Sequence, residues 1–176
     1  MSAAVLPRLI YFKEIVMSSQ NRNLSSVEGS EVKSAADFTF GIVWAEWNHE
    51  VTYALYKGAY DTLVKYGAKP ENIISKTVPG TFELTLGAQW LAEQKKVDAV
   101  IAIGCVIQGE TRHFDFICDA VANGITNLNI KFNKPVIFGV LTPDNHQQAI
   151  DRAGGRHGNK GDEAAITAIK MLHFGR

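Results

Sequence analysis

Apolar residues follow two alternating patterns from Phe38 onward. Short, nearly continuous apolar runs predict buried strands in four places, at residues 38–44, 73–78, 97–103 and 135–141. Apolar residues at helical spacing predict helices between and after them, at residues 51–66, 82–91, 114–130, 146–152 and 163–172. Strands that alternate with helices indicate βαβ crossovers. We therefore expect an α/β domain whose parallel sheet is covered by helices on both faces.

Residues 1–37 lack this pattern. The segment 17–37 is rich in Ser, Asn and Glu, and we expect it to be disordered or loosely held. The apolar stretch before it is too interrupted for a signal peptide. We therefore expect an N-terminal extension, 1–37, and one domain, 38–176. Met17 as the natural start is one interpretation of the extension, and an organelle transit peptide, with arginines among serines but also several glutamates, is another.

Composition and charge argue against several classes of function for this protein. The 176 residues are 46% apolar, which suffices for a full core, and the 18 basic residues are balanced by 18 acidic ones. This balance argues against a nucleic-acid partner, and no apolar run approaches the roughly 18–20 residues of a membrane span. Cys105 and Cys118 lie in apolar segments, which predicts reduced, buried thiols in a cytoplasmic protein rather than a disulfide framework.

The loop after the third predicted strand carries the strongest chemical signal. Gly109 lets backbone N–H groups approach a ligand, and Thr111 adds a hydroxyl just before a helix start, where free N–H groups bind anions. His113 can transfer a proton near neutral pH. An anion site beside a proton carrier, at the carboxyl end of a strand, is typical of an α/β enzyme.

Two other loops after strands leave alternatives open. Trp47 is either core filler or a platform that stacks on a heteroaromatic ring. Thr81 and Glu83, which we expect in the first turn of a helix, either start that helix or bind a polyol or an amide edge. The segment 152–161 holds four glycines and three cationic residues. Alone it is a weak phosphate loop, and a flexible connector with solvated charges is the alternative.

The motifs become specific when they are taken together. They are Trp47-Asn48, the segment 78–83, the segment 104–115, the segment 138–142, and Arg152-Ala153-Gly154 with the segment 158–161. In order and spacing they resemble the 6,7-dimethyl-8-ribityllumazine synthase family of riboflavin biosynthesis. The resemblance implies a flavodoxin-like three-layer sandwich with a four-stranded parallel core sheet. It also implies a transferase that condenses 5-amino-6-(D-ribitylamino)uracil with 3,4-dihydroxy-2-butanone 4-phosphate, without metal or cofactor.

The resemblance also assigns site residues. His113 would be the proton shuttle. The substrate-binding residues would be Trp47, Asn48, Thr81, Phe82, Glu83, Cys105, Val106, Ile107, Gly109, Glu110, Thr111, Phe138, Arg152 and Lys160. Within this set, Trp47 would stack on the pyrimidine, residues 81–83 would hold the ribityl chain, and residues 109–111 would bind the phosphate.

Phe138, Arg152 and Lys160 would come from the neighbouring subunit of a homopentamer, Arg152 pairing with the phosphate. The length of the segment 154–161 favours family members that join twelve pentamers into an icosahedral shell. A functional link to riboflavin synthase is a further expectation. Cys105, Gln108 and Arg112 depart from common family variants, which leaves hydrogen bonding at the pocket rim open.

Three rival functions share part of this evidence. A flavodoxin-type electron carrier would have the same fold class but no use for His113. A phosphosugar isomerase or aldolase is the second rival, and an aldolase needs a lysine buried at a strand end, whereas Lys160 lies in a glycine-rich segment. A purely structural shell protein does not explain why polar residues gather after strands.

Overall fold

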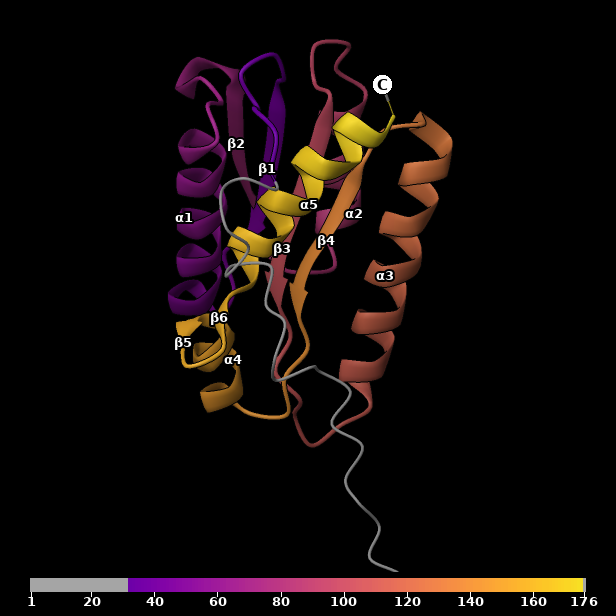
Figure 1. The fold of residues 1–176 in the computed structure, drawn as a ribbon. Helices are drawn as coiled ribbons and strands as arrows, with labels where there is room; N and C mark the ends of the chain where they lie inside the picture. The colour runs from indigo at the N-terminus through magenta and orange to yellow at the C-terminus, as the bar shows by residue number, and fades with distance from the viewer. Residues whose placement is uncertain (1–31, 176) are drawn as a thin grey trace, which may run out of the picture.

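The computed structural model describes residues 32–175, which fold around one parallel sheet (Figure 1). Its strands are β1 (Phe40–Ala45), β2 (Ile73–Val78), β3 (Ala99–Cys105) and β4 (Val136–Leu141), in the order β2-β1-β3-β4. All three pairings are parallel, and β3, at the centre, is buried along its whole length. The four predicted strands and the parallel sheet are confirmed.

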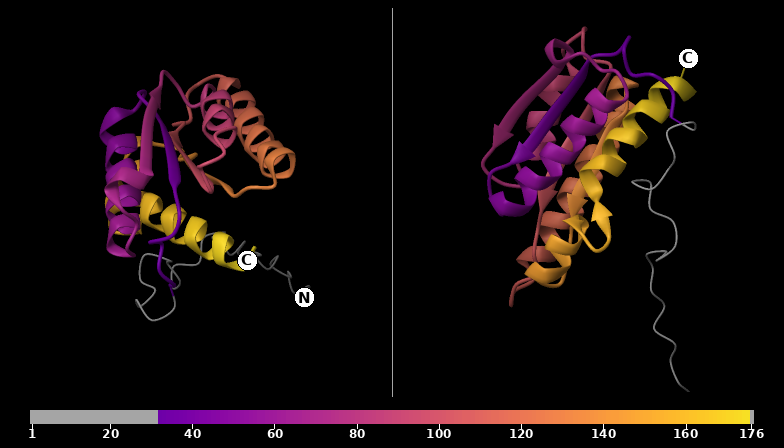
Figure 2. Two further views of the ribbon diagram at one scale, coloured as in Figure 1. Left: turned by 90° about the horizontal axis from the view of Figure 1, so that it is seen from above. Right: turned by 60° about the vertical axis from the view of Figure 1, so that its left-hand side comes forward.

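Helices cover both faces of this sheet. They are α1 (His49–Lys65), α2 (Leu84–Ala92), α3 (His113–Phe132), α4 (His146–Arg152) and α5 (Lys160–Phe174), with a 3-10 turn, η3, at Pro70–Asn72. Helices α1 and α5 pack together on one face, and α2 and α3 pack on the other (Figure 2). The result is the flavodoxin-like three-layer sandwich that the sequence analysis predicts.

Helix α2 is where the sequence prediction was wrong in detail. The helix begins at Leu84, so Thr81 and Glu83 precede it instead of lying in its first turn. The reason is a tight turn, in which the Gly80 N–H donates to Glu83 Oε2 at 3.0 Å. Four apolar residues mark the predicted helix: Phe82, Leu86 and Trp90 are exposed, whereas Leu91 is buried as expected. The face that α2 buries carries Leu91 together with Leu84 and Ala88.

The glycine-rich segment after α4 is also more ordered than one alternative predicts. It forms a small antiparallel ladder of β5 (Ala153–Gly155) and β6 (Gly158–Asn159). Gly154 and Gly158 take positive φ values of 109° and 77°, which side chains rarely allow. A flexible connector is therefore the wrong interpretation of this segment.

The described part of the predicted extension, residues 32–37, packs on the domain. Val32 and Ala35 belong to the core cluster between the sheet and helices α1 and α5, and the Ala35 N–H donates to the Tyr66 carbonyl at 2.8 Å. Residues 1–31 lie outside the described residues, so the extension and its boundary stay predictions.

Close packing of α1 against α5 fixes the start of α5. The Asn159 side chain accepts from the Gly161 N–H at 2.8 Å and donates to the Ala54 carbonyl in α1 at 3.0 Å. A Cβ on Gly161 would collide with the backbone carbonyl of Leu55. This glycine therefore sets how closely the two helices approach.

We predict that Gly161→Ala destabilises the fold by roughly 1–3 kcal/mol, because the backbone of a helix cannot move aside as a flexible side chain can. Denaturant unfolding measures the effect. Gly109→Ala is the matched control, since apart from Gly109 and its two chain neighbours no heavy atom of the described residues lies within 4 Å of the position its Cβ would take. Equal stability of the two variants would contradict the packing account.

Candidate active site

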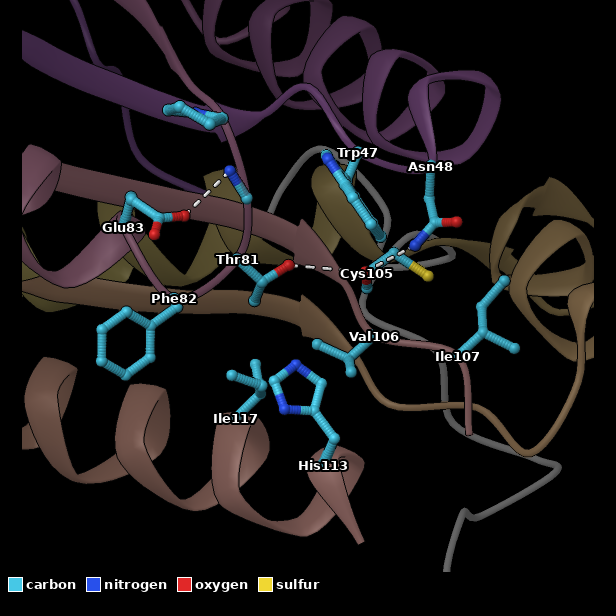
Figure 3. A pocket seen from close by; sticks show the side chains of 12 residues that line it. Trp47, Asn48, Thr81, Phe82, Glu83, Cys105, Val106, Ile107, His113 and Ile117 are labelled. Atoms are coloured by element: carbon cyan, nitrogen blue, oxygen red, sulfur yellow. Dashed lines mark hydrogen bonds between the residues drawn. The ribbon is translucent and has the colours of Figure 1, made fainter. Parts of the chain in front are cut away.

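A pocket of about 680 Å³ opens at the carboxyl ends of β1, β2 and β3 (Figure 3). This volume suits a small-molecule ligand. The pocket is lined by Trp47, Asn48, Pro79, Gly80, Thr81, Phe82, Glu83, Cys105, Val106, Ile107, His113 and Ile117. The structure therefore gathers nine of the fifteen predicted site residues around one cavity.

Trp47 forms one wall of this pocket. Its side chain is 75% exposed, so the core-filler interpretation is wrong. Its backbone N–H donates to the Pro79 carbonyl at 3.1 Å, which ties the loop after β1 to the loop after β2. A flat indole that is held by its backbone and open on the pocket side suits stacking against an aromatic ligand.

The turn at residues 80–83 forms the next wall. Thr81 is 6% exposed, and its hydroxyl donates to the Cys105 carbonyl at 3.4 Å. The turn reaches this carbonyl because Gly104 carries no side chain: a Cβ there would lie 2.9 Å from Thr81 Oγ1. Glu83 stays exposed at the pocket, and one of its carboxylate oxygens accepts from the Gly80 N–H.

The end of β3 forms the floor. Burial raises the pKa of the Cys105 thiol to about 12, and Cys105 is 2% exposed. The Val106 N–H donates to the Leu141 carbonyl at 2.9 Å, and the Gln108 N–H donates to the Pro143 carbonyl at 3.0 Å. Both cysteines are free thiols, as predicted, but Cys118 is half-buried rather than buried.

His113, the first residue of α3, faces the pocket opposite this floor (Figure 3). Its backbone N–H lies 3.4 Å from the Thr111 hydroxyl oxygen, which accepts the bond just before the helix. Gly109, Glu110 and Thr111 are exposed and belong to the loop that leads into α3, outside the pocket lining. The start of a 20-residue helix therefore presents the positive end of its dipole beside the imidazole.

Three predicted site residues lie apart from the pocket of their own chain. Arg152 donates to Glu163 Oε1 at 2.8 Å and to the His157 carbonyl at 2.6 Å, while Lys160 donates to Glu163 Oε2 at 3.1 Å. Phe138 is 37% exposed and does not line the pocket either. Within one subunit, the cations of Arg152 and Lys160 are paired with a nearly buried carboxylate.

Three lining residues are not among the predicted site residues, and these are Pro79, Gly80 and Ile117. Ile117 follows His113 by four residues on α3, and this spacing could have placed it on the same helix face. Within residues 32–175, no group of three or more His, Cys, Asp or Glu side chains could hold a metal ion. No helix in that range is long and apolar enough to cross a membrane.

Comparisons with known proteins all indicate the same enzyme family. A family model described as 6,7-dimethyl-8-ribityllumazine synthase matches residues 37–176. The chain is 68% identical over 156 residues to the 6,7-dimethyl-8-ribityllumazine synthase of Cytophaga hutchinsonii, covering 89% of this chain and 98% of that protein. It is 56% identical over 158 residues to the protein of the same name from Parabacteroides distasonis, covering 90% and 99% of the two chains.

We predict that Cys105 resists alkylation by iodoacetamide at pH 8.5 in the folded protein, because its raised pKa leaves almost no thiolate and its burial excludes the reagent. The Cys118→Ser variant isolates this thiol for mass spectrometry. Alkylation should become complete only in denaturant. Rapid modification of the native variant would contradict the buried position.

Proposed function

The chain belongs to the 6,7-dimethyl-8-ribityllumazine synthase family, and from this we infer how its pocket residues act in the reaction. The protein is a transferase of riboflavin biosynthesis. It condenses 5-amino-6-(D-ribitylamino)uracil with 3,4-dihydroxy-2-butanone 4-phosphate to give 6,7-dimethyl-8-ribityllumazine, phosphate and water. The observation that supports our assignment of roles is that an exposed indole, from the loop after β1, and an imidazole, from the start of α3, line the same pocket.

We propose that the pyrimidine ring stacks on Trp47 and that the ribityl chain runs along the turn at residues 80–83. The open indole face supports stacking. Glu83 uses one carboxylate oxygen to hold the turn, and the other can accept from ribityl hydroxyls. Phe82, Val106 and Ile107 supply apolar surface around the ring.

The butanone phosphate binds at residues 109–111 and the start of α3 in this proposal. The positive end of the α3 dipole favours an anion, the Thr111 hydroxyl adds a donor, and the open surroundings of Gly109 leave room for the phosphate oxygens. This placement brings the ketone of one substrate toward the amine of the other, with the imidazole of His113 beside both.

His113 acts as the general acid and base. The pyrimidine amine attacks the ketone, and loss of water from the carbinolamine gives an imine. Removal of the proton next to the imine expels phosphate, after which the enol tautomerises. The ribityl-bearing amine then attacks the remaining carbonyl, and a second loss of water closes the ring. Because each step moves a proton and phosphate leaves readily, the protein supplies mainly positioning and one proton carrier.

We further propose that Phe138, Arg152 and Lys160 complete the pocket of a neighbouring copy. Two observations support this. These residues lie outside the pocket of their own chain, and large apolar side chains are exposed on one subunit: Phe116 is 67% and Ile130 is 77% exposed. Arg152 would exchange part of its pairing with Glu163 for the phosphate.

A site shared head to tail between identical subunits closes into a ring, and we propose a pentamer, with twelve pentamers joined into a shell. The short β5–β6 ladder, which leaves the segment 154–161 without an insertion, supports the shell. We also propose a cytoplasmic location, consistent with two free thiols, and a functional link to riboflavin synthase, which would use the lumazine product.

We predict that the purified chain forms fluorescent lumazine from the two substrates and that His113→Ala slows turnover by about 10- to 100-fold, at or below the usual range for a general acid or base. Steady-state assays at several pH values measure the loss. A decrease beyond about 10⁵-fold would contradict a mainly positional mechanism. Phe174→Ala, at the far end of α5, is the control for handling and folding.

We predict that impaired His113→Ala and impaired Arg152→Ala subunits, when they are dissociated, mixed and reassembled, gain activity above that of either variant alone. Mixed rings would contain pockets in which both contributed halves are wild-type. Native mass spectrometry verifies the mixed rings, and each variant reassembled alone is the control. If verified mixed rings show no recovery, Arg152 and His113 of the same subunit act in the same pocket, and the shared-site proposal is wrong.

A further inference from the structure

Asn48 has an unusual backbone conformation for the residue before a helix. Its φ of 57° and ψ of 44° lie in the left-handed region, and its side chain makes no capping hydrogen bond to α1. An asparagine at this position ordinarily has extended backbone and caps the helix with its side-chain oxygen. Left-handed backbone outside glycine persists where the surroundings impose it, often at functional sites.

The Asn48 side chain instead forms a hydrogen bond to the end of a neighbouring strand, β3. Its Nδ2 donates to the Cys105 carbonyl at 2.8 Å, so the loop after β1 is tied to the end of β3 (Figure 3). The same carbonyl accepts from Thr81 Oγ1 at 3.4 Å. Three loops therefore meet at one carbonyl oxygen, and Asn48 provides the link that lies next to Trp47.

We propose that Asn48 is a positioning residue that sets the orientation of Trp47 for the pyrimidine. The left-handed turn changes the chain direction directly after Trp47, and the amide fixes that turn against β3. The preceding backbone is already held, because the Trp47 N–H donates to the Pro79 carbonyl. The resemblance would make Asn48 a substrate-binding residue, but with its amide bonded to the Cys105 carbonyl we infer that it acts through Trp47 rather than by contact with substrate. This inference rests on the proposed stacking role of Trp47.

Two substitutions separate the effect of the left-handed backbone at Asn48 from the effect of its side-chain amide. Asn48→Gly keeps the left-handed conformation and removes the amide, whereas Asn48→Asp keeps the shape and places an acceptor against the Cys105 carbonyl. We expect both to raise the KM for the ribitylaminouracil by roughly tenfold, the size of one lost ordering hydrogen bond. Both should also weaken the quenching of tryptophan emission by this substrate. The KM for the butanone phosphate should stay within about twofold.

Asn133 offers a matched control. It is the other residue besides glycine with positive φ among residues 32–175, at 47°, and it ends α3 on the protein surface, outside the pocket lining. Asn133→Gly should leave both KM values and the quench unchanged. If Asn48→Gly behaves like this control, changing only the melting temperature, Asn48 is merely structural and the proposal is wrong. If Asn48→Gly does not fold, the same criterion applies to Asn48→Asp.

A double-mutant cycle with Trp47→Ala tests the route of the effect. If Asn48 acts through Trp47, Asn48→Gly should add less than about twofold to the pyrimidine KM once Trp47 is removed. Full additivity of the two effects would show that Asn48 acts independently of Trp47 and would overturn the proposal. Failure of the stacking assignment is distinguishable, because Trp47→Ala alone would then leave the pyrimidine KM and the quench unchanged.

Discussion

The parallel register of β1 between β2 and β3 is the constraint on which the site depends. Ala45 pairs with Val78 on one side, and Trp44 pairs with Ile103 on the other, so the three strands end nearly level. Their following loops must then share one small volume at the edge of the sheet. The Cys105 carbonyl occupies its centre and accepts from both neighbouring loops. A shift of one residue in either pairing would separate the groups that now line the pocket.

On the face of the sheet covered by α1 and α5, packing between these two helices holds the side chains at the start of α5 in place. Contact between α1 and α5 is close enough that Gly161 meets the backbone of Leu55. That contact fixes the first turn of α5 and, with it, Lys160 and Glu163. Glu163 pairs with two cationic side chains at modest exposure, and in their proposed phosphate-binding role this ordering would lower the entropy lost on binding.

Particular elements show what the sequence could predict. The strands Ile73–Val78 and Ala99–Cys105 were identified because apolar runs between loop signals have few other interpretations. The start of α2 was misplaced because a side-chain contact inside the turn, from Gly80 to Glu83, decides it. Periodicity also misjudged Trp90, since spacing alone does not reveal which apolar face packs on the sheet. The conformation of Asn48 arises from contacts between distant strands, so no local pattern predicts it.

The buried Cys105 thiol in the pocket floor raises the question of a side reaction between the protein and its ketone substrate. One substrate is a ketone, and ketones are carbonyl electrophiles that thiolates attack reversibly. Burial raises the pKa of the Cys105 thiol to about 12, so the thiol stays protonated near neutral pH. Burial of Cys105, which is 2% exposed, therefore disfavours a hemithioketal with the ketone substrate, so a sulfur atom can pack in the wall of a pocket that handles an electrophile.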